Sequence, residues 1–213
     1  MDKKELQMKS IYIFLTRSGT VLSHLVYTFT KEPYTHVSVA FDDDLGTLYS
    51  SSRKNGYTLF PAGPCREFLN QGLFTRWGEI PCAVYELRVE DHVYHQARQL
   101  AEEMVSQDFY HFNIFGLLLC KMNIRLQRQR HFFCSQFVSE VLRQSQALEL
   151  PKDCVLMRPS DFLQLSGLRC LYCGLLKDLP QRQRMQLGEP VSMTTVYFHL
   201  MMAAARRSWQ RMR

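Results

Sequence analysis

Four stretches in the first half of the chain have the alternating or continuously apolar pattern typical of β-strands: residues 11–15, 34–41, 47–53 and 83–89. In the second stretch, Val37 and Val39 fall on one side and His36 on the other, because side chains alternate along an extended chain. The short turn at residues 42–46 predicts that the second and third stretches form an antiparallel hairpin. The imidazole of His36 is therefore predicted to project from the face opposite the packed apolar residues.

Apolar residues at helical spacing predict three further elements. Residues 21–29 read as a helix, and residues 91–105 carry one apolar stripe behind Asp91, a candidate helix cap. A third amphipathic helix begins at Cys134. Residues 55–81, rich in Gly and Pro, read as a loop. Together these elements predict an α+β domain in which an antiparallel sheet packs against helices.

Length and charge divide the chain unequally. With 213 residues, of which 46% are hydrophobic, one substantial core is expected. Residues 181–213 contain six arginines against Glu189 alone, a net charge of +5 that leaves +1 for the rest. We therefore assign residues 1–180 to the domain and 181–213 to a basic tail that is predicted to be helical. This tail could dock on the domain, on an anionic surface or on an acidic partner.

Seven cysteines, an odd number without a disulfide-rich rhythm, favour a reducing compartment. No apolar leader and no stretch approaching 18 apolar residues is present, so a cytoplasmic protein is predicted. Cys170 and Cys173 have Cys-x-x-Cys spacing, but no second pair accompanies them, and we interpret them as small apolar residues near a strand. No metal, no other cofactor and no nucleic acid is expected.

Cys134 is the strongest candidate for chemistry. At the first turn of a helix, exposed N–H groups and the helix dipole favour a negative sulfur, so the thiolate forms more readily there than in free cysteine. A cysteine nucleophile needs a neighbouring base, and His36, on its strand, is the most suitable side chain. The interpretation is that Cys134 attacks a carbonyl while His36 accepts and returns the proton.

Short motifs along the chain resemble a known family. A Tyr34-Thr35-His36-Val37 strand followed 98 residues after the histidine by Phe133-Cys134-Ser135-Gln136 is similar to the circularly permuted NlpC-type papain-like cysteine hydrolases, particularly the YiiX-like group. Residues 110–116 and 157–162 also resemble segments of that family. The resemblance implies a permuted papain-like fold and the hydrolysis of an amide or peptide bond through a Cys134 thioester.

In that family a third polar residue on the following strand usually orients the histidine. The corresponding strand here offers only serines, and Ser50 is the predicted counterpart, although a register slip of one residue would choose Ser51. Tyr34 and Arg53 are candidate substrate contacts.

Two other functions are compatible with these residues. One is a lipid acyltransferase or thioesterase of the related permuted group, although Ser135-Gln136 after Cys134 departs from that group's motif. The other is a non-catalytic binding module with a degenerate site, which a missing third residue would favour. The partner expected for the enzyme is a peptide or another substrate that contains an amide, and the oligomeric state is left open.

Overall fold

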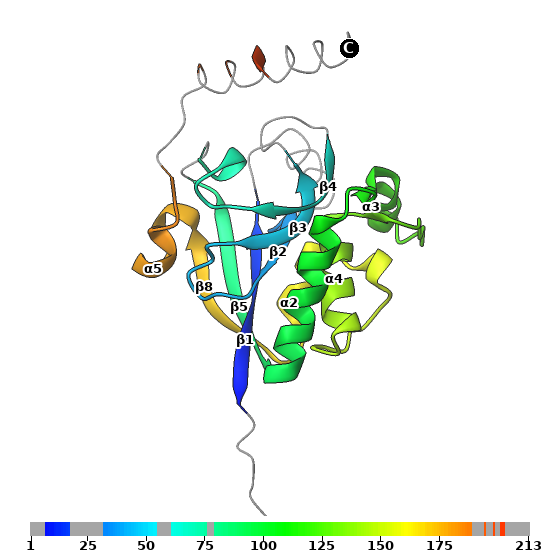
Figure 1. Cartoon of the computed structure of the whole chain (residues 1–213), viewed down its shortest axis with the longest axis horizontal. Helices are drawn as coiled ribbons and strands as arrows, with labels where there is room; N and C mark the ends of the chain where they lie inside the picture. Colours follow the sequence, from blue (N-terminus) through cyan, green and yellow to red (C-terminus); the bar gives the residue numbers. More distant parts are fainter. Residues whose placement is uncertain are drawn as a thin grey trace, which may run out of the picture.

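A computed structural model of the chain describes residues 7–17, 32–54, 61–75 and 79–188, together with Thr194, Phe198, Met201 and Met202. Its centre is a six-stranded sheet in the order β4-β3-β2-β1-β5-β8, in which all neighbouring strands are antiparallel (Figure 1). The strands are β1 (Met8–Thr16), β2 (His36–Ala40), β3 (Leu48–Arg53), β4 (Ala62–Glu67), β5 (Pro81–Glu90) and β8 (Leu168–Leu175).

Two helices cover one face of this sheet, α2 (Asp91–Ser106) and α4 (Cys134–Gln144) (Figure 1). Alternate residues of β1 and β2, among them Ile13 and Val39, pack against Phe137 and Val141 of α4 in the main hydrophobic core. On the other face, a second cluster gathers Phe14, Ala40, Leu48 and Val84. The central strands are therefore buried on both sides, which explains why residues 11–15 of β1 are continuously apolar.

The predicted α+β class with an antiparallel sheet and packed helices is confirmed. Every strand expected from the apolar pattern is present, and the third expected helix begins at Cys134, as predicted. The helix expected at residues 21–29 lies outside the described residues. Asp91 begins α2 but does not cap it, since Glu90 occupies the N-cap position and no side chain caps the helix.

The loop predicted for residues 55–81 is wrong in part, because this segment contains β4. Pro64 has no N–H to donate, which is tolerated because β4 is the edge strand of the sheet. Gly63 is required by a close approach, since a Cβ there would come within 2.8 Å of the Tyr110 carbonyl oxygen. Composition therefore concealed a strand whose Gly and Pro have specific structural reasons.

A small substructure connects α2 to α4. The two-residue strands β6 (His111–Phe112) and β7 (His131–Phe132) pair in parallel and enclose α3 (Ile114–Lys121). Asn113 caps α3 by accepting a hydrogen bond from the Gly116 N–H at 2.9 Å. No helix in the described part of the chain is long and apolar enough to cross a membrane.

The beginning of the basic tail contacts the domain. Short helix α5 (Gln181–Arg184) places Arg182 in an ion pair with Asp43, while Gln186 donates to Asp44 at 3.0 Å. Residues 181–188 thus pack on the β2–β3 turn. Most of the tail beyond residue 188, including the arginines near its end, lies outside the described residues.

Candidate catalytic site

Cys134 is the first residue of α4 and lies beside the sheet where β2 and β3 separate. The two strands pair only through Val39 with Tyr49 and Ala40 with Leu48 among the described residues, so β2 is free of β3 near its start. The backbone N–H groups of Val37 and Ser135 lie near the Cys134 sulfur and lower its pKa. The cysteine is 5% exposed and belongs to the main hydrophobic core.

His36 connects this sulfur to a carboxylate. It is the first residue of β2, opposite Thr16 of β1, and its side chain is 18% exposed. Its Nε2 lies 3.1 Å from Oε1 and 3.0 Å from Oε2 of Glu67. The imidazole is also close enough to Cys134 for each side chain to shift the pKa of the other. Because Nε2 faces Glu67, Nδ1 is the ring nitrogen assigned to the sulfur.

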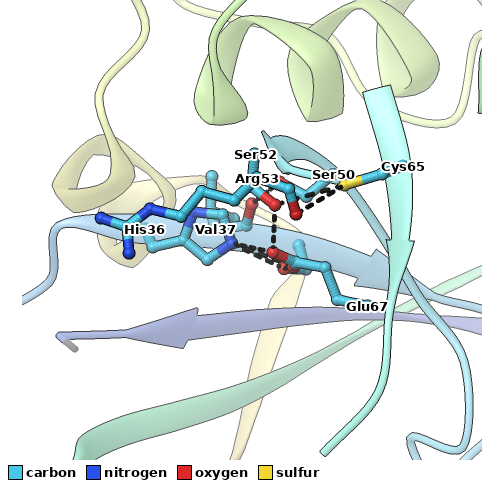
Figure 2. Close-up of polar contacts among 8 residues, drawn as sticks. His36, Val37, Ser50, Ser52, Arg53, Cys65 and Glu67 are labelled. Carbon is cyan, nitrogen blue, oxygen red and sulfur yellow. Dashed lines mark hydrogen bonds and ion pairs between the residues drawn. The ribbon is translucent and has the colours of Figure 1, made fainter. Parts of the chain in front are cut away.

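Glu67, the last residue of β4, is held by two serine hydroxyls. Ser38 donates to Oε2 and Ser52 donates to Oε1, each at 2.6 Å. Figure 2 shows Glu67 pointing from its strand toward the imidazole, with Ser52 reaching it from β3. The carboxylate therefore joins three strands, and its orientation is fixed by hydrogen bonds that favour its ionised form.

The three groups change one another's acidity. Burial raises the pKa of Cys134, but the His36 hydrogen bond and charge, with the two backbone N–H groups, outweigh burial and lower it. Burial lowers the pKa of His36, but Glu67 and Cys134 together hold it well above 6.5. Burial likewise raises the pKa of Glu67, and His36 with the two serines reverses that effect. The arrangement favours a thiolate, an imidazolium and a carboxylate in a row.

The prediction that Ser50 orients His36 is not what the geometry shows. The Ser50 hydroxyl donates to the Val37 carbonyl at 2.7 Å, and Glu67 is the side chain that hydrogen-bonds Nε2. The alternative, Ser51, donates to the Phe132 carbonyl at 2.7 Å. Both hydroxyls serve backbone groups, and Ser50 helps to satisfy β2 where it lacks β3 as a partner.

Sequence reasoning missed Glu67 because it ends a strand that was read as a loop. The resemblance predicts the residue that orients His36 on β3, the strand that follows His36 in the sequence. Glu67 instead lies on β4, the neighbour of β3 at the edge of the sheet. One available signal was the pair of serines Ser50 and Ser52, which lie two residues apart and so on the same side of β3. Such a face needs a polar partner, and Glu67 is the acidic residue closest in sequence beyond it.

The two predicted substrate contacts have different surroundings. Tyr34 is 7% exposed and its hydroxyl lies 3.4 Å from the Cys173 sulfur, which leaves little of it for a substrate. Arg53, at the end of β3, is half-buried, and in Figure 2 its guanidinium projects past the imidazole and away from Glu67. Its substrate contact stays a prediction.

The described residues contain no group of three or more His, Cys, Asp or Glu side chains that could hold a metal ion. Cys170 and Cys173 lie on β8, as the strand interpretation expected, and both are exposed. An irregularity in the β5–β8 pairing places Cys170 opposite Tyr85 and Cys173 opposite Ala83.

The comparisons with known proteins add no relative. No protein-family model matches the chain, and no curated protein is similar enough to count as a match. The functional argument therefore depends on the site itself.

Ser50→Ala and Ser52→Ala form a matched test of these assignments. Ser50→Ala leaves a buried carbonyl without its donor and is expected to lower the free energy of unfolding by about 1–2 kcal/mol. Ser52→Ala removes a donor to Glu67, which raises the pKa of that carboxyl, so the stability that its ionised form supplies is lost at a higher pH as the solution is acidified. Urea unfolding at a series of pH values measures both effects. An earlier loss of stability on acidification in Ser50→Ala but not in Ser52→Ala would contradict the assignment.

Proposed function

We propose that the protein is a cysteine hydrolase that cleaves an amide or peptide bond through a thioester on Cys134. One observation carries this proposal: a single imidazole hydrogen-bonds a buried carboxylate and also lowers the pKa of the thiol at a helix N-terminus. This is the nucleophile, base and orienting group that cysteine catalysis requires. The resemblance to permuted NlpC-type papain-like hydrolases supports the same reaction and the same fold class.

In the first half of the reaction, the Cys134 thiolate forms a bond to the substrate carbonyl carbon. The negative charge moves to the carbonyl oxygen, which backbone N–H groups of the first turn of α4 stabilise. Phe133 is the N-cap residue of α4, and its side chain accepts no hydrogen bond from the N–H groups of the first turn. These groups are therefore not occupied by a capping side chain. The carbon–nitrogen bond then breaks, and the His36 imidazolium gives its Nδ1 proton to the leaving amine.

In the second half, neutral His36 takes a proton from water as the water oxygen attacks the thioester. The carbon–sulfur bond breaks, the carboxylic acid leaves, and the thiolate–imidazolium pair is restored. Glu67 holds the ring at Nε2 throughout and stabilises its positive charge. It is a positioning residue, since its carboxylate contacts the histidine and not the reacting atoms.

Glu67 also bears on the non-catalytic alternative. The binding-module interpretation was favoured by an absent third residue, and a buried carboxylate supported by Ser38 and Ser52 takes away that reason. The acyltransferase alternative uses the same three residues and differs only in whether water or another nucleophile receives the acyl group.

Trapping of the acyl-enzyme tests the proposed function. The full chain is incubated with a panel of N-acyl peptides and N-acyl p-nitroanilides, quenched in acid and analysed by intact mass spectrometry. We expect a mass increase equal to the acyl group, located on Cys134 by peptide mapping and absent in Cys134→Ala. Release of the acid in water identifies a hydrolase, whereas transfer to an added amine or alcohol contradicts hydrolysis. Selective alkylation of Cys134 without cleavage of any panel member would also count against the proposal.

A further inference from the structure

Helix α3 is apolar on all sides, yet only one side is covered. Leu117 and Cys120 are buried against Phe133, next to the nucleophile. On the other side, four large apolar side chains of the helix and the turn after it are exposed, and we call them the α3 tip: Phe115 (60%), Leu118 (52%), Met122 (68%) and Ile124 (45%). A helix that is hydrophobic all round is normally buried, so the exposed side calls for a partner.

The chain around the α3 tip is basic. Residues 109–139 contain Lys121, Arg125, Arg128 and Arg130 and not a single Asp or Glu. Lys121 is paired with Glu32 and Arg125 with Asp153. Arg128 and Arg130 are exposed and have no ion pair within the described part of the chain. Arg130 instead lies over the Phe109 ring, with its guanidinium carbon 4.6 Å from the centroid, and Phe109 is itself 43% exposed.

The α3 tip is rigidly connected to the candidate site. Asn113 donates its N–H to the Phe132 carbonyl at 3.0 Å and caps α3 with its side chain. Phe132 is two residues from Cys134, and the pairing of β6 with β7 ends at this connection. In Figure 1, α3 lies at the outer edge of the molecule beside α4 and beyond β4. A surface that contacts the tip therefore lies against the substructure that leads directly into Cys134.

We propose that the α3 tip docks on an anionic lipid bilayer. Large apolar side chains at the tip would enter the interfacial region, while Arg128 and Arg130 would contact negatively charged headgroups. Charge complementarity selects this occupant, because an uncharged apolar partner would leave the two arginines without counter-charges. If the proposed function also holds, docking directs the enzyme to amides in lipids or in lipid-linked peptides, a consequence that rests on that function.

Vesicle co-sedimentation of the full chain tests the proposal. Phosphatidylcholine vesicles are used with and without about 30% phosphatidylglycerol, which supplies the anionic surface. We expect binding to the anionic vesicles that weakens in high salt, as screened electrostatic attraction does. Phe115→Ser combined with Leu118→Ser should weaken binding about tenfold or more, because two exposed apolar side chains are lost. Arg128→Gln with Arg130→Gln should remove much of the preference for anionic vesicles.

Matched variants separate this surface from the rest of the chain. Leu171→Ser and Arg88→Gln change an exposed apolar and an exposed basic residue elsewhere, and both should bind like the unaltered chain. Arg206→Gln, Arg207→Gln and Arg211→Gln together test the basic tail. Binding that is lost in the tail variant and retained in the α3 variants would overturn the proposal. A chain that binds no vesicle of either composition would also overturn the proposal. The same holds if the chain binds no vesicle and the α3 variants only convert an oligomer into a monomer, since the tip would then contact a second copy of the chain.

The vesicle experiment gives its answer independently of catalysis. Cys134→Ala should bind vesicles like the unaltered chain, because the sulfur is not part of the α3 tip. If the unaltered chain binds vesicles but forms no acyl-enzyme, the proposed function alone is contradicted. Loss of vesicle binding with cleavage of soluble amides intact would contradict the docking proposal alone.

Discussion

Replacement of His36 by alanine is expected to slow alkylation of Cys134 at pH 6 by about tenfold or more. The hydrogen bond and charge of His36 are what lower the pKa of Cys134, and burial alone would raise it. Without the imidazole, the thiolate fraction at pH 6 falls to about the level of a free thiol or below. The thiolate of a less acidic thiol is intrinsically more nucleophilic, but this gain is smaller than the loss of thiolate. Cleavage of an amide substrate should fall further, by about 100-fold or more, because the proton donor and acceptor are lost together.

The pH profile makes this prediction specific. In the unaltered chain, the lowered pKa of Cys134 and the raised pKa of His36 define a window in which the thiolate–imidazolium pair persists. In His36→Ala, the alkylation rate should instead rise about tenfold per pH unit until the thiol titrates. Iodoacetamide labelling with peptide mapping measures both profiles. His92→Ala, which changes an exposed histidine, is the control. Overlapping profiles for the unaltered chain and His36→Ala would show that the two side chains do not form a reactive pair.

Glu67→Gln is expected to produce the second large effect, on both activity and stability. The glutamine keeps the size of the side chain but removes the charge that raises the pKa of His36. The imidazolium then loses its proton at lower pH, so the alkaline limb of the reactive window moves down. We expect amide cleavage near pH 7 to fall by about tenfold to 100-fold, because the ring is less well oriented and its positive charge is less stabilised.

The stability effect has a defined pH range. Because the folded-state pKa of Glu67 is lowered, its contribution is fully present above about pH 4.5 and is lost as the pH falls through the folded value. Because that of His36 is raised, its contribution is fully present below about pH 6.5 and is lost as the pH rises through the folded value. The difference in unfolding free energy between the unaltered chain and Glu67→Gln should therefore be largest between these two pH values.

Urea unfolding at pH 5.5 and at pH 9 measures this difference, with Glu149→Gln as a control at an exposed glutamate. The control should behave like the unaltered chain at both pH values. If Glu67→Gln lost the same free energy of unfolding at both, the charge of Glu67 would not be coupled to His36, and its positioning role would be refuted.

Much of the sheet could be predicted from the local pattern of apolar and polar residues. Alternation placed β2 and oriented His36, and continuous apolar sequence identified β1, since a strand covered on both faces has few polar positions. The amphipathic pattern after Phe133 located the start of α4 and so the environment of Cys134. These features depend on near neighbours in the sequence, and periodicity reports such neighbours directly.

Glu67, the third residue of the site, could not be predicted in this way. Pro64 and Gly63 disguise β4, because one is tolerated by the edge position and the other is required by the approach of Tyr110. Both the edge position of β4 and the approach of Tyr110 arise only when the sheet is assembled, so neither can be predicted from the local sequence. The resemblance predicts the third residue on the strand after His36, where Ser50 lies, but the Ser50 hydroxyl donates to the Val37 carbonyl instead.

The amino-acid sequence by itself determined that this chain forms an antiparallel α+β domain with Cys134 at a helix start and His36 on a strand, because local periodicity encodes both. The tertiary structure alone decided that Glu67 meets His36, because strand order brings a residue 31 positions away to within 3.0 Å of Nε2. It alone also showed that one side of the apolar helix α3 is covered and the other exposed. Both outcomes depend on which segments become neighbours in space, and that choice is made by the packing of the whole domain.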